Sequence, residues 1–250
     1  MTVKFRPKGS KYIKLLSRDL KSNKSGFKHN FKYSLLKLVC KNNTLANFQL
    51  DEIIYRYLNK NSNLTILDIG AGLCNYYPES VKNSRHKYIA YDLSKDMKKN
   101  LEARGILIFQ ADINKDKLKL EDKSIDLIIC SHLIEHLENP TNLINEIERL
   151  LSNSGLLLIK TPDIRSVKWN FYNDFTHIKP YSKSSLIQQI QSEELKVLNC
   201  FSTTLYLDFA KNILKRNPLN PFNIIFYIVG IYTFYFRKDM RELLCIAKKI

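Results

Sequence analysis

The feature that most constrains the fold is an alternation of short apolar runs with helical segments between residues 64 and 160. Helices are predicted from Ser94 to about Arg104 and over 139–151, where Pro140 is the start signal and Asn153-Ser154-Gly155 is the stop signal. Strands that alternate with helices and are apolar along their length are typical of a parallel sheet covered on both faces. The apolar runs, rich in isoleucine and leucine, predict strands at 64–69, 87–92, 105–110, 124–130 and 155–160.

Further apolar runs extend this pattern towards the C-terminus. A helix over 183–192 and a strand over 195–201 follow the fifth predicted strand, and 241–249 is predicted to be one more strand. We therefore expect an α/β fold with a Rossmann-like, seven-stranded, mostly parallel sheet and helices on both faces.

Composition divides the chain into four segments. We expect a basic, helical N-terminal extension over 1–44, a core over 45–205, an apolar and aromatic insertion over 206–240, and a last core strand within 241–250. The net charge is +16, of which residues 1–41 carry +11, because twelve Lys and Arg stand there against one Asp. This charge would suit a nucleic acid or an anionic membrane, but the lysines are scattered singly, which favours a solvated surface.

The compartment is indicated by the cysteines and the first residues. The five cysteines are dispersed and contain no C-x-x-C pair, which favours reduced thiols over a disulfide framework or a zinc site. The start, M-T-V-K-F-R-P-K-G-S-K, lacks the apolar stretch of a signal peptide. We expect a cytoplasmic protein, with a peripheral position at the inner face of the membrane as an alternative.

The segment I-L-D-I-G-A-G-L-C, residues 66–74, indicates a nucleotide-type cofactor. A strand ends in Asp68, and Gly70 and Gly72 let the backbone turn sharply and approach a ligand closely. Asp92, at the end of the next strand, suits ribose hydroxyls. A dinucleotide is disfavoured, because Asn75 replaces the last glycine of G-x-G-x-x-G and Asp68 would repel a pyrophosphate. An acidic residue there suits S-adenosylmethionine (SAM), which carries an ammonium group and no phosphate.

These residues resemble the motifs of class I SAM-dependent methyltransferases of the type 11/23 group over residues 60–205. L-D-I-G-A-G is similar to the family's first motif, Y-D-L-S to its ribose-binding second, Q-A-D-I (110–113) to its adenine-side third, and 124–140 to its fourth strand and following turn. Cys74 stands where many members have a third glycine. The resemblance implies SAM as cofactor, held by Asp68, Gly70, Gly72, Asp92, Leu93, Asp112, Ile113, Ser131 and Leu133.

His132-Leu-Ile-Glu-His136 matches H-x-x-E-H, an inverted zinc-protease motif. The motif follows a strand and precedes Pro140 at a helix start, so it is predicted to form a strand-to-helix turn, and we expect no metal. In the methyltransferase resemblance this turn lies beside the methyl end of the cofactor. His132 is therefore a candidate catalytic residue, with Glu135 and His136 supporting the turn.

A further histidine lies in N-D-F-T-H-I-K-P-Y-S, in the loop after the fifth strand. Ligands of open α/β sheets bind at the carboxyl ends of the strands, and this loop begins there. Its D-x-T-H-x-x-P run resembles a signature of methyltransferases associated with surface-polysaccharide (O-antigen type) synthesis. His177 is the candidate general base for a hydroxyl nucleophile; the alternative is that it only fixes the turn before Pro180. Candidate substrate contacts are Trp169, Tyr172, Asp174, Thr176 and Tyr181.

Fifteen residues without a charge, 222–236, lie between Lys215-Arg216 and Arg237-Lys238. The run is short for a membrane span, which needs about 20 apolar residues. A returning strand at 241–249 would also keep both ends of the run on one side of a membrane. The run predicts either a helix that covers the substrate or one that lies in a membrane interface.

The sequence thus predicts a SAM-dependent methyltransferase that O-methylates a sugar or glycan acceptor. The alternatives are a small-molecule or quinone-precursor methyltransferase, an RNA methyltransferase and a non-catalytic SAM-binding scaffold. Nucleic acid is disfavoured as a partner, because Cys130-Ser131-His132-Leu133 stands where a base-amino methyltransferase has N/D-P-P-Y/F.

Overall fold

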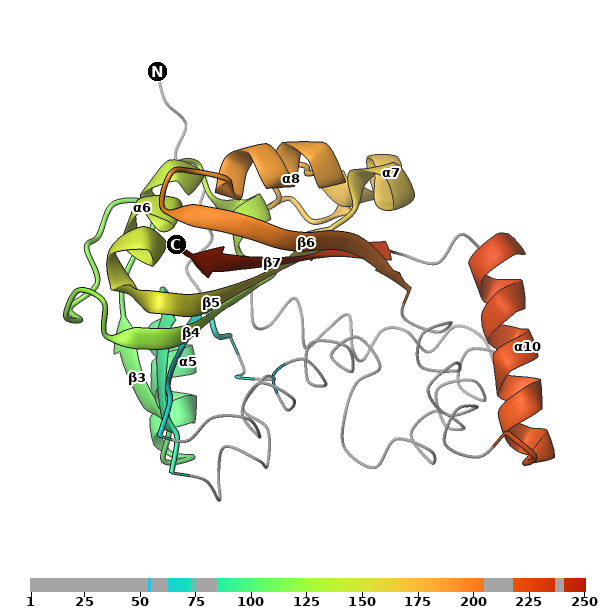
Figure 1. Cartoon of the computed structure of the whole chain (residues 1–250), viewed down its shortest axis with the longest axis horizontal. Coiled ribbons are helices and arrows are strands. Elements are labelled where there is room, and N and C mark those ends of the chain that lie inside the picture. Colours follow the sequence, from blue (N-terminus) through green and yellow to red (C-terminus); the bar gives the residue numbers. More distant parts are fainter. Residues whose placement is uncertain (1–53, 55–62, 73, 75–84, 205–217, 237–240) are drawn as a thin grey trace.

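The computed structural model describes residues 54, 63–72, 74, 85–204, 218–236 and 241–250. These residues form a seven-stranded sheet of order β3-β2-β1-β4-β5-β7-β6 (Figure 1). The first five strands are parallel, and β7 is antiparallel to both β5 and β6. The strands are β1 (Thr65–Ile69), β2 (Lys87–Asp92), β3 (Leu107–Gln110), β4 (Ile125–Ser131), β5 (Leu151–Pro162), β6 (Leu195–Thr204) and β7 (Arg241–Lys249).

Helices cover both faces of this sheet. One buried apolar cluster joins α6 (Pro140–Leu150) and α8 (Lys183–Ile190) to one face of the strands. A second cluster joins Leu101, of α5 (Lys95–Glu102), and Ile54 to the other face. In Figure 1, α8 lies above β6, whereas α5 lies on the lower side of the sheet. The predicted Rossmann-like, mostly parallel α/β sheet is confirmed.

The strands are apolar on both sides because both sides are buried. In β4, Ile128 and Cys130 enter the cluster with α6 and α8, and Leu127 and Ile129 enter the cluster with α5. Each of these four side chains is at most 1% exposed. A central parallel strand therefore has no polar face, which is why its sequence is a continuous apolar run.

Local capping groups define the helix starts. Ser94 caps α5 by accepting a hydrogen bond from the backbone of Met97, and Ser182 forms a capping box with Ser185 at α8. Pro140 occupies the first turn of α6, where its missing N–H has no cost.

The end of α6 differs from the prediction. The helix ends at Leu150 and the chain enters β5 directly at Leu151, so Asn153, Ser154 and Gly155 lie inside the strand. A Cβ on Gly155 would lie 2.9 Å from the carbonyl oxygen of Ser152. The glycine thus permits a close backbone approach within an irregular strand start and does not stop the helix.

The last strand places a C-terminal residue at the carboxyl edge of the parallel strands. β7 pairs with β5 so that Glu242 faces Pro162 and Lys248 faces Leu156. Because β7 is antiparallel to β5, it begins where β5 ends. Glu242 therefore reaches the edge at which cofactor loops of such sheets lie.

Several predicted segments fall wholly or mainly outside the described residues: the basic extension 1–44, most of the first part of the core (45–62), and the first part of the insertion (206–217). The charge-free run forms α10 (Pro221–Phe236), which Figure 1 shows in red at one end of the molecule. No helix in the described ranges combines the length and apolarity that a membrane crossing needs. The described cysteines, Cys74, Cys130, Cys200 and Cys245, are free and buried.

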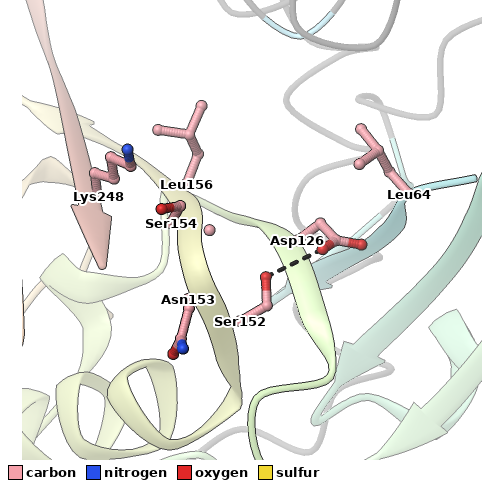
Figure 2. Close-up of a pocket in the computed structure, with 8 residues that line it drawn as sticks. Leu64, Asp126, Ser152, Asn153, Ser154, Leu156 and Lys248 are labelled. Atoms are coloured by element: carbon pink, nitrogen blue, oxygen red, sulfur yellow. Dashed lines mark hydrogen bonds between the residues drawn. The ribbon is translucent and has the colours of Figure 1, made fainter. Parts of the chain in front are cut away.

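A hollow at the amino ends of the parallel strands lies at the opposite edge from the glycine loop. It is lined by residues from the start of β1, β4 and β5 and the end of β7. Figure 2 shows Ser152 donating to Asp126 across it, at 3.1 Å. The second carboxylate oxygen of Asp126 accepts from the Thr65 backbone at 2.9 Å. This carboxylate therefore joins neighbouring strands.

Candidate active site

The glycine loop after β1 has the geometry that its sequence predicts. Gly70 and Gly72 have φ of +71° and +52°, in the left-handed region that favours glycine. A Cβ on Gly70 would lie 2.9 Å from Cδ1 of Leu133. The backbone N–H groups of Gly70 and Ala71 both donate to the carbonyl of Tyr91, at 2.8 and 3.1 Å. The loop is thus held between β2 and the turn after β4.

Asp92 lies at the end of β2 and fixes this loop. Its two carboxylate oxygens accept hydrogen bonds from the backbone of Gly72 at 2.9 Å and of Ser94 at 2.8 Å. Each oxygen keeps a second lone pair, so Asp92 can also accept from ribose hydroxyls. Leu93, the next residue, is 51% exposed and offers an apolar surface beside it.

Asp68 lies beneath the loop and not on its surface. Its side chain is 1% exposed and accepts a hydrogen bond of 2.5 Å from the hydroxyl of Tyr88. Burial raises the pKa of this carboxyl to about 7, and the hydrogen bond from Tyr88 opposes that rise. A cationic group nearby would lower this pKa and restore the charged form.

Asp112 and Ile113 occupy the loop after β3, next to the end of β2. The backbone of Ala111 donates to the carbonyl of Asp92 at 3.1 Å, which joins the two loops. The carboxylate of Asp112 accepts from the backbone of Asn114 at 3.2 Å. Ile113 is buried. The three motif loops after β1, β2 and β3 therefore meet at one edge of the sheet.

The turn after β4 contains a histidine bound at both ring nitrogens. His132 has φ of +52°, and its Nδ1 lies 3.2 Å from Glu135 and its Nε2 lies 2.9 Å from Glu242. Although burial lowers the pKa of His132, the two carboxylates outweigh it and raise the pKa to about 9. The ring is therefore a cation at neutral pH and has no lone pair to accept a proton. This geometry suits a fixed charge and not a general base.

Glu242 connects that turn to two strands. Its other oxygen forms an ion pair of 2.6 Å with Lys160 of β5, whose side chain is 3% exposed. Glu135 accepts a hydrogen bond from Thr161 at 2.9 Å. Residues 134–136 form a 3₁₀ turn, η2 (Ile134–His136), which agrees with the predicted strand-to-helix turn.

His177 is held in one tautomer by its own loop. Its Nδ1 lies 2.6 Å from the carbonyl oxygen of Phe171, and its ring stacks on the Phe171 ring with centroids 4.4 Å apart. Because a carbonyl only accepts, Nδ1 carries the proton and the lone pair lies on Nε2. This is the form in which an imidazole can take a proton or bind a cation.

The sequence predicts His136 only as a support for the turn, but the structure places it beside His177. Its ring lies 4.7 Å from the ring of His177. Its Nδ1 lies 2.9 Å from Oγ1 of Thr176, which in turn donates to Asp174 at 2.6 Å. Burial lowers the pKa of His136, so its ring is neutral. The Asp174-Phe-Thr176-His177 run thus positions both histidines.

The remaining substrate candidates divide into two groups. Trp169 and Tyr172 both lie in η3 (Lys168–Asn173) and are 85% and 50% exposed. Tyr181 is 1% exposed and belongs to the core cluster with Leu186. Asp174 and Thr176 direct their hydrogen bonds into the loop. Of the five candidates, only the two aromatic residues of η3 present open surface.

Comparison with known proteins decides what this arrangement is. Residues 44–199 match the profile of a family described as Methyltransferase domain. The chain belongs to this family. SAM is the cofactor of this methyltransferase, and the loop residues fit it: no atom of the described chain lies within 4 Å of a Cβ built on Gly72, which leaves room there for a ligand.

The chain is also similar to individual proteins and to a solved structure of the same fold. The methyltransferase is 28% identical to an uncharacterized protein of Methanocaldococcus jannaschii over 183 residues. This alignment covers 70% of this chain and 74% of that protein. A probable SAM-dependent methyltransferase of Mycobacterium tuberculosis is 26% identical over 117 residues, 46% of this chain and 42% of that protein. The structure of a SAM-dependent methyltransferase from Archaeoglobus fulgidus has a TM-score of 0.54 at 21% identity, over 87% of this chain and 99% of that chain.

Proposed function

We propose that this enzyme methylates a hydroxyl group of a sugar or glycan and that His177 accepts the hydroxyl proton. The observation that carries the proposal is the tautomer of His177, in which Nδ1–H donates to the Phe171 carbonyl and the lone pair lies on Nε2. SAM supplies the methyl group. A positioned base assists a hydroxyl nucleophile by roughly 10²–10⁴-fold.

The exposed aromatic side chains around His177 support a polyhydroxyl acceptor. Trp169, Tyr172 and Phe175 are each at least half exposed, and the rings of Trp169 and Tyr172 lie 6.1 Å apart. Aromatic faces pack against the C–H surfaces of a sugar ring, while polar groups bind its hydroxyls. In this proposal Asp68, Asp92, Leu93, Asp112, Ile113, Ser131 and Leu133, with Gly70 and Gly72, line the cofactor site.

We also propose that α10 contacts an anionic membrane surface, which would suit a lipid-linked glycan acceptor. Spacings of three, four and seven residues give α10 an exposed apolar face. Basic pairs, Lys215-Arg216 and Arg237-Lys238, flank the helix in the sequence, and an interfacial helix combines these two features. The side chains of this face, each at least 42% exposed, are Phe222, Ile224, Ile225, Ile228 and Val229.

The acceptor class is tested with methyl-labelled SAM and a panel of sugars, glycolipid extracts, quinone precursors, amines and RNA. We expect label in the sugar or glycolipid fraction. His177→Ala should keep its affinity for SAM and lose at least tenfold in kcat. Lys179→Ala, a change in the same loop, is the matched control. Label confined to quinone precursors or RNA would replace the glycan proposal, and normal turnover by His177→Ala would remove the base.

The membrane proposal is tested by sedimentation with vesicles of anionic or neutral lipid. The wild-type enzyme should sediment with anionic vesicles, less so as salt increases. The double variant Ile225→Glu, Ile228→Glu should remain in the supernatant and still bind SAM. If the wild type binds neither vesicle but the variant has a raised KM for acceptor, α10 covers the substrate instead.

A further inference from the structure

Three donor side chains converge beside the acceptor loop. The carboxylate of Glu135 and ring nitrogens of His136 and His177 all lie within 4.8 Å of one another. Glu135 and His136 are neighbours in η2, whereas His177 belongs to the loop after β5. The backbone N–H groups of Ile178 and Lys179 donate to the carbonyl of Glu135, at 2.8 and 3.0 Å. These bonds hold the two segments together.

Both rings have the same proton arrangement. Nδ1 of His177 donates to a backbone carbonyl, at 2.6 Å. Nδ1 of His136 lies 3.2 Å from the carbonyl and 2.9 Å from the hydroxyl oxygen of Thr176, whose own proton goes to Asp174. Each ring therefore keeps its lone pair on Nε2. Histidines that bind a metal are held in this way, with the second nitrogen donating to an oxygen.

Glu135 supplies the negative charge. Its oxygens contact His132 and Thr161, and each keeps a further lone pair. Two neutral imidazoles and one carboxylate form a donor set that suits Zn²⁺, Fe²⁺ and Mn²⁺.

The pair of histidines differs from the pair that the H-x-x-E-H pattern suggests. In a metalloprotease helix, His132 and His136 would both bind the metal. Here both nitrogens of His132 contact carboxylates, so it cannot serve as a ligand. The folded loop brings His177 to His136 in its place.

We infer that Glu135, His136 and His177 bind one divalent cation, and that its open positions take two adjacent hydroxyls of the acceptor. The inference rests on the proposed function, which supplies the polyhydroxyl acceptor. Bonds of about 2.0–2.2 Å to a cation bring three donors to about 3–3.5 Å from one another. Cation binding would therefore draw the three donors closer together than they lie without a cation.

The cation changes how the acceptor proton leaves. His177 can act as the base of the proposed function only in the cation-free enzyme, because Nε2 cannot accept a proton while it binds the cation. A bound cation lowers the pKa of a coordinated hydroxyl. The hydroxyl proton then goes to solvent water, and the oxygen takes the methyl group of SAM, with neutral S-adenosylhomocysteine as the second product. The cation-bound enzyme would act on vicinal diols.

The site is tested by direct cation binding to the full-length protein after dialysis against a chelator. Titration with Co²⁺ alone should give visible absorption bands at one equivalent per chain, and calorimetry with Zn²⁺ or Mn²⁺ should give the same stoichiometry. His136→Ala and His177→Ala should each weaken binding at least tenfold. Thr176→Val, which removes the hydroxyl that contacts His136 and keeps the backbone carbonyl, should weaken it by about tenfold.

The matched control is His86→Ala, which removes a histidine outside the site and should leave cation binding unchanged. Circular dichroism and SAM affinity check that each variant is folded. Wild-type binding weaker than about 1 mM, or equal binding by wild type and His136→Ala, would overturn the inference.

Activity separates this inference from the proposed function. We expect the chelated enzyme to methylate diol acceptors slowly and to regain at least tenfold in rate with Zn²⁺ or Mn²⁺. Full activity without a cation, lost in His177→Ala, would keep the proposed function and reject the catalytic cation. If no sugar is methylated with or without a cation, the proposed function fails, and the binding titration alone still decides the site.

Discussion

Gly70 lies directly against Leu133, so that a Cβ on the glycine would come within 2.9 Å of Cδ1 and 3.1 Å of Cβ of that side chain. This contact joins the first cofactor loop to the turn after β4. The two segments are distant in the chain, and both belong to the predicted SAM site. The absence of a side chain at residue 70 therefore sets how closely these segments approach.

Gly70→Ala should weaken SAM binding by at least tenfold and destabilise the protein by about 1–3 kcal/mol. The physical reasons are the positive φ and the clash with Leu133. Calorimetry with SAM and urea unfolding measure the two effects. Gly105→Ala, which shares a positive φ of +75° but has no atom of the described chain within 4 Å of the added Cβ, is the matched control. Equal SAM affinity in Gly70→Ala and Gly105→Ala would contradict the role of the contact.

Asp68→Asn should change how stability depends on pH. The folded-state pKa of Asp68 is raised from 3.8 to about 7. The neutral carboxyl is thus the form that the folded protein favours, and its stabilising contribution is present below pH 3.8 and is lost as pH rises to 7. Asparagine stays neutral. Relative to wild type, the variant should therefore become more stable between pH 5 and pH 8, by about 3 kcal/mol.

Melting temperatures without SAM, measured at pH 5, 6.5 and 8, test this pH dependence. In the proposed cofactor site the variant should also bind SAM at least tenfold more weakly, because it lacks the charge proposed to face the ammonium group. Asp96→Asn, an exposed change in α5, controls for the loss of one negative charge. A difference in melting temperature that stays constant from pH 5 to pH 8 would show that Asp68 ionises normally.

Glu242→Ala should destabilise the protein by about 2–4 kcal/mol. The change leaves the buried Lys160 ammonium, 2.6 Å from Glu242, without this partner, and removes one of the carboxylates at His132. Urea unfolding measures the loss. The control is Glu102→Ala, because Glu102 and its partner Lys98, 3.6 Å away, are 52% and 40% exposed; an exposed pair contributes about 0–1 kcal/mol. Similar losses in both variants would mean that Glu242 contributes no more than a surface ion pair.

The sequence alone determined the order of strands and helices and the position of the cofactor motif. These features depend on local patterns: continuous apolar runs predict buried strands, and Ser94, Pro140 and Ser182 start helices through contacts with neighbours in the chain. Gly70 and Gly72 were recognisable because a turn with positive φ requires glycine. One local signal was misleading. Gly155 was expected to stop the helix over 139–151, but it lies inside β5, where it permits a close approach of the backbone.

The tertiary structure decided which polar groups meet. His132 and His136 are neighbours in a recognisable motif. In the folded chain, however, His132 contacts Glu242, whereas His136 contacts Thr176 and His177. Tyr181, a candidate for acceptor contact by its place in the sequence, is buried in the core. These outcomes depend on the antiparallel register of β7 and on how the loop after β5 packs against η2. Contacts between distant residues arise from packing and strand pairing, which no local pattern of residues encodes.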